Sequence, residues 1–402
     1  MAASAAAATA IQSIPIIDID THYTEPADLW TSRAPSRFKG QVLETRRNAA
    51  GVEDWYIGSD YVTFKLGVID RNEEKRKGVL ALDTLDEMSS AQSNPEDRVR
   101  MMDRFGIAAA LLYPNVVGFG ATRLMELNAS EELRLFHVEA YNDAIAQLQR
   151  AGQGRLYPQA VLPLWDMDAT LKELRRCRED LGLTGVVMSD APHAFGQPVL
   201  SDPAWDRFWS TCQDLALPIN FHIGSSGVSF AGDYWGSAFG PTEDGAPDRV
   251  RSVFSATSVF IMNFRDITNL ILSGVLERFP RLKFVSVESG VGWIPFVIQS
   301  LDYTMDEILS REQRARFKRT AKQMFMDQIY ASYWFEGPNN VDNYISEFGV
   351  DNLMFETDYP HPQCLYPQVR EKVVETLGKY DLPTQRKVLF ENAARLYGIP
   401  VS

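Results

Sequence analysis

The sequence places histidine and carboxylate residues at the ends of several apolar segments. Asp20 and His22 belong to the tripeptide Asp-Thr-His that follows "IPIIDI", and the chain has only five histidines in total. His222 ends "LPINFH", Glu288 ends "LKFVSVE", and Asp358 follows "NLMFET". Neutral imidazoles and carboxylates together form a donor set that suits a borderline divalent cation such as zinc or manganese. Because the set contains no thiolate, it leaves room for water or substrate, and we expect a catalytic site.

The spacing within Asp-Thr-His allows its two outer side chains to face the same way. Residues i and i+2 of a strand point to one face, so Asp20 and His22 can both turn toward the inside of a barrel. A lone Asp-x-His motif is weak evidence, and His222 and Asp358 strengthen it. The alternatives are a hydrogen-bonded core histidine at position 22, a simple turn residue at 358, and a helix-capping role for Glu288.

Distant residues of this kind need a scaffold that brings strand ends together. Short apolar segments alternate with helical patterns from about residue 98 onward. The predicted strands are 14–20, 107–114, 156–164, 184–189, 217–222, 282–289, 329–334 and 352–357. The predicted helices include 130–151, 167–180, 201–216 and 341–349, with Ser201-Asp202-Pro203 as a typical helix start. Buried strands that alternate with helices indicate an α/β fold, and eight of them predict a (β/α)8 TIM barrel.

One segment interrupts this alternation. Within residues 26–95, "EDWYIGSDYVTFKLGVID" alternates like antiparallel strands, and "EEKRKG" is a solvated charge run. We predict an insertion after strand 1 that forms a lid or wall, because long βα loops lie on the active face of a barrel. A separate amino-terminal domain is the alternative. The alanine-rich residues 1–13 lack the features of a secretory signal and are expected to be a disordered lead-in, so that 14–402 form the barrel.

Composition excludes several classes of function. The net charge of −13 and the absence of a Lys/Arg-rich block argue against nucleic acid as a partner. No apolar run of about 18 residues is present, which argues against a membrane-spanning helix. The three cysteines, Cys177, Cys212 and Cys364, lie far apart without CxxC spacing, which favours a reducing, cytoplasmic location.

Four segments carry a resemblance to a known family. They are "DIDTHYTEPADLW", "GQPVLSDPAWDRFWSTCQDLALPINFHIG", "LILSGVLERFPRLKFVSVESGVGWIP" and "LMFETDYPH". Together they resemble the amidohydrolase-related family (amidohydrolase 2 type), which includes aminocarboxymuconate-semialdehyde decarboxylase and γ-resorcylate decarboxylase. The resemblance covers about residues 16–396. It implies a distorted (β/α)8 barrel, a homodimer and one metal ion held by Asp20, His22, His222 and Asp358.

The resemblance also implies a reaction, with one departure from the family pattern. Family decarboxylases usually carry a histidine after strand 6 that transfers protons, whereas this chain has Glu288 in "VESGVGWIP". We therefore assign proton transfer to Glu288 and Asp358. The expected activity is nonoxidative decarboxylation of a small aromatic or muconate-like acid. The alternatives are metal-dependent hydrolysis of a C–C, C–N or ester bond and a non-catalytic binding protein.

Other residues are candidates for supporting roles. Tyr23 and Trp293 are predicted to form aromatic walls for a planar substrate, with core packing as the alternative for each. His361 follows the last strand and is predicted to contact substrate. For Glu25, orientation of a metal ligand and capping of the next helix both stay open. His137 lies within a predicted helix and is interpreted as structural.

Overall fold

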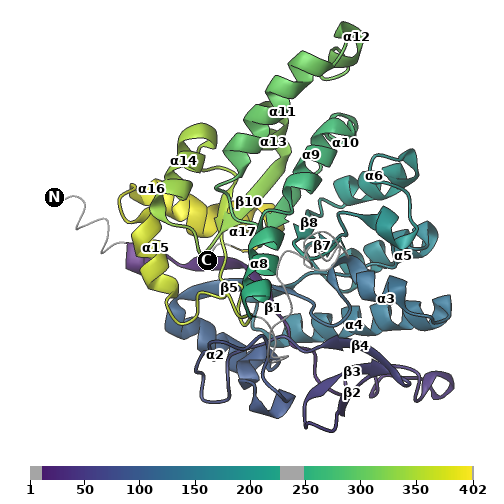
Figure 1. Cartoon of the computed structure of the whole chain (residues 1–402). Coiled ribbons are helices and arrows are strands. Elements are labelled where there is room, and N and C mark those ends of the chain that lie inside the picture. The colour runs from purple at the N-terminus through teal and green to yellow at the C-terminus, as the bar shows by residue number, and fades with distance from the viewer. Residues whose placement is uncertain (1–10, 227–248, 401–402) are drawn as a thin grey trace.

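The centre of the molecule is a set of short parallel strands (Figure 1). The computed structural model describes residues 11–226 and 249–400. Within these ranges, a parallel strand overlaps each of the eight predicted strand segments. The strands are β1 (Ile16–His22), β5 (Ile107–Tyr113), β6 (Leu156–Pro158), β7 (Val186–Val187), β8 (Ile219–His222), β9 (Phe284–Val287), β10 (Ile329–Tyr333) and β11 (Leu353–Phe355).

The strands close into a barrel through two short connections. Regular pairing gives two sheets, with the orders β1-β5-β6 and β11-β10-β9-β8-β7. Between β6 and β7, the Val187 N–H donates to the Ala160 carbonyl at 2.9 Å. Between β11 and β1, the His22 N–H donates to the Tyr359 carbonyl at 2.7 Å. The strands therefore follow one another around the barrel in chain order, and the predicted distorted (β/α)8 fold is confirmed.

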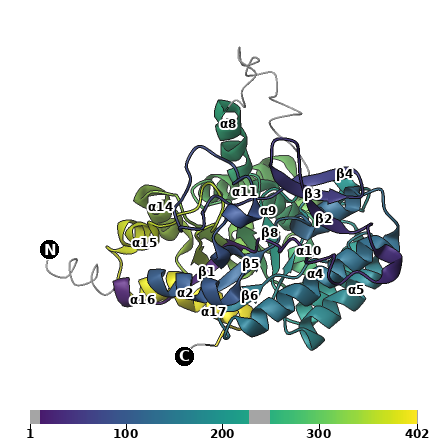
Figure 2. The same cartoon turned by 90° about the horizontal axis from the view of Figure 1, so that it is seen from below.

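Hydrophobic side chains fill both faces of the barrel wall. Ile17, Ile19 and Leu111 belong to an inner cluster, whereas Ile16 and Leu112 belong to a larger cluster between the strands and the helices. This alternation is the two-residue period of a strand with both faces buried. Side chains of α17 (Asn392–Tyr397) join the inner cluster on the side of the strand N-termini, away from α8 (Arg249–Phe260) in Figure 2.

Helices surround the barrel and begin where the sequence provides caps. Ser130 accepts the Leu133 N–H at the start of α4 (Glu131–Ala151). Asp202 accepts the Ala204 N–H, and Pro203 between them is the first helical residue, as predicted. The remaining α-helices are α2 (Pro95–Phe105), α3 (Thr122–Glu126), α4 (Glu131–Ala151), α5 (Met167–Arg175), α6 (Asp206–Asp214), α9 (Phe264–Leu272), α10 (Val275–Arg278), α11 (Ile294–Ile308), α12 (Arg311–Arg314), α13 (Ala321–Gln328), α14 (Pro338–Phe348), α15 (Val369–Leu377) and α16 (Leu382–Arg386).

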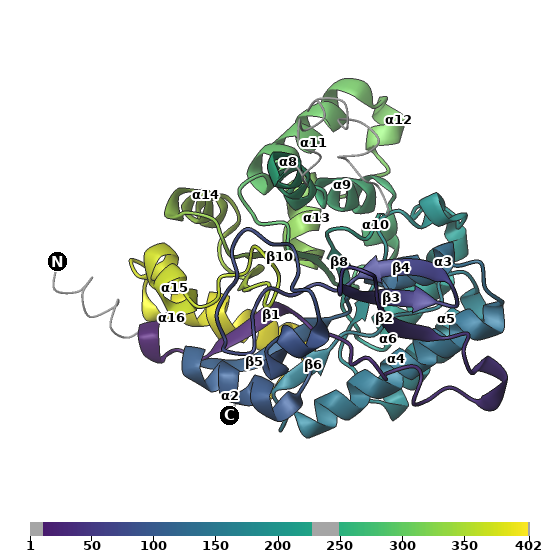
Figure 3. The same cartoon turned by 60° about the horizontal axis from the view of Figure 1, so that its bottom comes forward.

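The insertion after β1 contains the predicted antiparallel strands. They are β2 (Leu43–Arg47), β3 (Glu53–Ile57) and β4 (Asp60–Phe64), paired in the order β2-β3-β4 (Figure 3). His137 of α4 fastens this sheet to the barrel, because its Nε2 accepts the Leu43 N–H at 3.1 Å and its Nδ1 donates to the Leu133 carbonyl at 2.7 Å. Burial lowers the pKa of His137 to about 4, so the ring is neutral. Its structural interpretation agrees with these contacts.

The lead-in is shorter than predicted at its C-terminal end. Residues 11–13 form the 3₁₀ helix η1 (Ile11–Ser13), in which Ile11 is buried. Arg370 of α15 donates to the Ile14 carbonyl at 2.8 Å, which holds this segment against the barrel. An apolar side chain and paired carbonyls thus order a stretch that composition alone suggested was disordered. Residues 1–10 of the predicted lead-in lie outside the described residues.

No helix in the described ranges is long and apolar enough to cross a membrane.

Candidate metal centre

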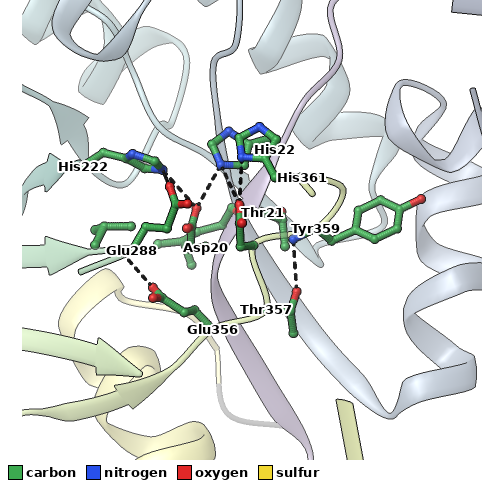
Figure 4. Close-up of polar contacts among 12 residues, drawn as sticks. Asp20, Thr21, His22, His222, Glu288, Glu356, Thr357, Tyr359 and His361 are labelled. Carbon is green, nitrogen blue, oxygen red and sulfur yellow. Dashed lines mark hydrogen bonds and ion pairs between the residues drawn. The ribbon is translucent and has the colours of Figure 1, made fainter. Parts of the chain in front are cut away.

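Five side chains from four strand ends converge at the C-terminal side of the barrel. We call Asp20, His22, His222, Glu288 and Asp358 the donor cluster, and Figure 4 labels all of them except Asp358. His22 Nε2 lies 3.5 Å from Asp20 Oδ1 and 3.5 Å from Asp358 Oδ1. His222 Nε2 lies 3.5 Å from Asp20 Oδ1 and 3.3 Å from Glu288 Oε2. All five side chains are buried. The residues predicted as ligands or proton-transfer groups therefore meet in one place.

An irregularity in β1 turns Asp20 inward. The pairing of β1 with β5 shifts register between Asp18 and Thr21. Ile19 faces the inner cluster, and yet Asp20, the next residue, also faces inward toward His22 and His222. Bulges of this kind re-aim side chains next to active sites. The simple i, i+2 rule correctly predicted that Asp20 and His22 meet, although the strand is not regular.

Two of the carboxylates stand on strained backbone. Glu288 and Asp358 have φ values of 55° and 60°, in the left-handed region that costs most residues about 1–2 kcal/mol. The Asp358 N–H donates to the Asp20 carbonyl at 2.9 Å, and the Glu288 N–H donates to Glu356 Oε2 at 3.3 Å. These bonds hold the two residues where each strand ends. Such strain concentrates at functional sites.

Most polar atoms of the donor cluster have no hydrogen-bond partner. Both oxygens of Asp20, Asp358 Oδ2, both ring nitrogens of His22, and His222 Nε2 are buried and have no hydrogen-bond partner among the described residues. An unsatisfied buried group costs about 1–3 kcal/mol, so this number of them in one place calls for a ligand. Donors at about 2.1 Å from a tetrahedral ion lie about 3.4 Å apart, close to the separations found here. The residues present fit a divalent cation.

The environment of His222 fixes which nitrogen faces the donor cluster. Its Nδ1 lies 2.8 Å from the Ile223 carbonyl, which can only accept a hydrogen bond, so the proton is on Nδ1. The lone pair of Nε2 therefore points into the cluster, as a metal ligand requires. The Phe119 ring stacks on the imidazole, with centroids 3.7 Å apart, and holds its orientation.

The electrostatics of the donor cluster favour a bound cation. Burial, with His361 and His222 nearby, lowers the pKa of His22 well below its usual value and keeps the ring neutral. Burial, followed by the charges of Asp358 and Asp20, raises the pKa of Glu288 well above its usual value. Burial and the charge of Asp20 likewise raise the pKa of Asp358. Crowded carboxylates repel one another, and a divalent cation relieves that repulsion.

A chain of hydrogen bonds orients His361. Asn115 Nδ2 donates to the Tyr23 carbonyl at 3.3 Å, which turns Asn115 Oδ1 toward His361 Nε2, 3.0 Å away. Because Oδ1 only accepts, Nε2 carries a proton. Nδ1 lies 2.8 Å from Asp358 Oδ1, a distance at which these two atoms share a further proton. Glu25 Oε1 accepts the N–H groups of Asn115 and Val116, each at 3.0 Å. Glu25 therefore acts on the loop after β5, and it caps no helix.

One buried carboxylate escaped the reasoning from sequence. Glu356 follows β11, and its Oε2 accepts the Ser332 hydroxyl at 2.5 Å in addition to the Glu288 N–H. Burial, followed by the charge of Asp20, raises its pKa well above the usual value. The signal was present in "NLMFETD", where an acidic residue ends an apolar strand two positions before Asp358. It was interpreted only as part of the strand.

Two predicted substrate contacts lie elsewhere. Tyr23 follows the inward-facing His22 and points to the other face, where it lines a separate cavity with Pro26 and Leu29. Trp293 precedes α11, and its indole N–H donates to the Ser289 carbonyl at 2.8 Å while the ring packs against the outer hydrophobic cluster. The core-packing alternative therefore describes Trp293 better. His361, in contrast, lines the cavity that also contains Glu288.

The chain is similar to proteins of a known family over most of its length. A family model described as Amidohydrolase matches residues 17–399. Gamma-resorcylate decarboxylase from Rhizobium sp. is 25% identical over 277 residues, which are 66% of this chain and 76% of that protein.

Solved structures show the same fold over nearly the whole chain. An amidohydrolase from Mycobacterium avium subsp. paratuberculosis is 21% identical, with a TM-score of 0.72 over 96% of this chain and 99% of that one. A dihydroxybenzoic acid decarboxylase from Polaromonas sp., with bound manganese and the inhibitor 2-nitroresorcinol, is 18% identical, with a TM-score of 0.59 over 97% of this chain and 98% of that one.

Proposed function

Because the chain belongs to the amidohydrolase family, as its sequence resemblance predicted, we propose that it is a metal-dependent decarboxylase of an aromatic or muconate-like carboxylic acid. The observation that carries this proposal is the convergence of buried donor atoms from Asp20, His22, His222 and Asp358. Glu288 also lies among the side chains whose donor atoms are close enough to share an ion. The decarboxylase activity named for the relative from Rhizobium supports the choice of reaction.

In this proposal Asp20, His22, His222 and Asp358 hold one divalent ion. Nitrogen and oxygen donors without sulfur suit zinc or manganese, and the manganese in the Polaromonas structure favours the latter. When bound, the ion supplies positive charge that attracts the oxygens of an acid substrate and stabilises negative charge that develops on them. His361 faces Asp358 and lies within reach of the same centre, where it would contact substrate.

Glu288 is the proposed proton donor. Burial and the neighbouring carboxylates raise the pKa of Glu288 well above its usual value, which favours the protonated form that can act as an acid. In decarboxylation, Glu288 would give its proton to the carbon that bears the carboxylate, and the C–C bond electrons would return to that carbon as carbon dioxide leaves. Glu288 then recovers a proton from water in the cavity that it lines. Glu356, bonded to the Glu288 N–H, would hold the donor in position.

Hydrolysis of a C–C, C–N or ester bond is the second candidate. The observation in its favour is the buried Asp358 carboxylate, whose Oδ1 lies 3.5 Å from His22 Nε2. In that reaction Asp358 would accept a proton from the attacking water. The two reactions differ in their products, since only decarboxylation releases carbon dioxide.

Product analysis on a panel of acids tests the choice of reaction. The panel contains hydroxybenzoates and a carboxymuconate semialdehyde, incubated with purified protein that retains its ion. We expect carbon dioxide release from at least one acid, and release that is about 10²–10⁴-fold slower after Glu288→Gln substitution. Hydrolysis of a matched ester or amide panel, without carbon dioxide from any acid, would establish the alternative and refute the decarboxylase.

The remaining predictions from the sequence concern the insertion, the oligomeric state and the location of the protein. Phe64, Leu66 and Leu80 of the insertion line the cavity that contains Glu288, which supports its predicted role as a wall. A homodimer and a cytoplasmic location stay predictions of the sequence.

A further inference from the structure

The cavity above the donor cluster is large and mostly apolar. It has a volume of about 600 Å³, within the range of about 300–1,000 Å³ that is typical of sites for drug-sized ligands. Glu288 and His361 belong to its lining and connect it to the donor cluster through His222 and Asp358. Phe119, which stacks on His222, and Ile223 continue the wall outward with apolar surface.

One wall of the cavity is a helix face with small side chains. Ser252, Ser255, Ala256 and Val259 of α8 line the cavity, and their spacing of three, four and seven residues places them on one side of the helix. Phe260 at the end of α8 is fixed by an edge-to-face contact with Trp334, with centroids 5.1 Å apart. Small side chains along this face leave width for a flat group beside the helix.

Another part of the cavity wall comes from the insertion. Phe64, which ends β4, lines the cavity together with Leu66 and Leu80. Phe64 and Leu80 are each 40% exposed, although most large apolar side chains of the described ranges are buried. A ligand that covers these side chains removes apolar surface from water, which favours binding.

From these observations we propose that Phe64, Leu66, Leu80 and Val259 form an outer subsite that binds a second apolar group of the substrate, of the size of an aromatic ring. The outer subsite belongs to the same cavity as Glu288 and His361, where the acid end of the substrate would lie. We therefore expect the group bound there to be another part of the same substrate molecule. The substrate class is therefore an acid with one polar end and an apolar extension. The position of the acid end rests on the proposed function, and the outer subsite rests on the cavity alone.

The binding affinities of simple aromatic acids test this subsite, and the measurement does not depend on enzyme activity. The dissociation constants of benzoate, 3-phenylbenzoate and 4-phenylbenzoate are measured by calorimetry on purified protein that retains its ion. We expect at least one phenyl-bearing acid to bind about 10-fold or more tightly than benzoate, since one methylene in an apolar pocket already changes selectivity by about 10-fold or more.

Two variants and a matched control locate the effect. The Phe64→Ala/Leu80→Ala double variant should lose most of the phenyl advantage and keep its affinity for benzoate. Phe64→Trp, which fills the subsite without truncation, should weaken the phenyl-bearing acids in the same way. Phe296→Ala, at a 76% exposed phenylalanine of α11 outside the cavity lining, should change nothing.

Equal affinities for all three acids, or a phenyl advantage that survives both substitutions, would overturn the outer subsite. A protein that discriminates among the acids as expected but releases carbon dioxide from none of the decarboxylation panel would instead refute the proposed reaction. The two failures are therefore distinguishable.

Discussion

His222 and Glu288 come from neighbouring strand ends and meet with 3.3 Å between Nε2 and Oε2. The contact places the proposed proton donor beside the proposed metal ligands. Glu288→Gln should therefore retain the ion and lower kcat by about 10²–10⁴, the usual contribution of general acid–base catalysis. Metal content and steady-state kinetics measure the two effects. Loss of the ion in this variant would show Glu288 to be a ligand, and unchanged kcat would return it to a structural role.

Asn115 accepts a hydrogen bond from His361 Nε2 and thereby orients the ring beside Asp358. Substitution of Asn115 should therefore change metal binding or catalysis at the donor cluster. Asn115→Leu removes the acceptor for the Nε2 proton of His361, which contacts the proposed ligand Asp358, and should lower metal affinity or kcat/KM by about 10–100-fold, the loss typical of residues that orient a metal ligand. Asn115→Asp keeps an oxygen acceptor at the same place and should lose less. Equal losses in both variants would show that the effect comes from packing and not from the hydrogen bond.

His137 fastens the insertion, and its removal should cost stability and leave the metal centre intact. His137→Ala leaves the Leu43 N–H without its acceptor, so we expect the free energy of unfolding to fall by about 1–3 kcal/mol. Denaturant unfolding of the metal-free protein measures the change. Metal content should be the same as in the wild type, and a variant that loses its ion would contradict a purely structural role.

Glu336 predicts a specific dependence of stability on pH. It accepts the N–H groups of Val291 and Gly292 in the turn that follows Glu288, and burial raises its pKa from 4.5 to about 7. A raised pKa means that the folded state binds the proton more tightly. The contribution of Glu336 to the free energy of unfolding is therefore complete below pH 4.5. It falls by roughly 3 kcal/mol as pH rises through 7.

Glu336→Gln should therefore unfold with a smaller loss of stability between pH 5 and 8 than the wild type. Glu371→Gln, at an exposed position of α15, is the matched control and should keep the wild-type slope. Unfolding free energies measured across this range give the comparison. Identical slopes for Glu336→Gln and the wild type would contradict the prediction.

The sequence was sufficient to predict the barrel and the convergence of the donor cluster. In parallel β/α units the C-terminal ends of all strands share one rim, so the ends of β1, β8, β9 and β11 locate Asp20, His22, His222, Glu288 and Asp358 without coordinates. Two-residue periodicity also predicted that Asp20 and His22 face one way. Helix starts such as Asp202-Pro203 depend only on local chemistry and were correct as well.

The details that failed depend on contacts between distant segments. Glu356 was missed because its two hydrogen-bond donors, the Ser332 hydroxyl and the Glu288 N–H, are distant in the sequence. An acidic residue at the end of an apolar segment does not indicate such partners. The direction of Tyr23 and the order of Ile11 likewise depend on what packs against them. The structure of the insertion beyond its antiparallel strands needs the same long-range information.

Metal analysis of purified protein, of His222→Ala and of His193→Ala tests the central claim most directly. His193 is an exposed histidine in η7 (Pro192–Phe195) and serves as the matched control. The account predicts about one zinc or manganese ion per chain in the wild type and in His193→Ala, and almost none in His222→Ala. No ion in any of the three, or equal ion content in all of them, would contradict it.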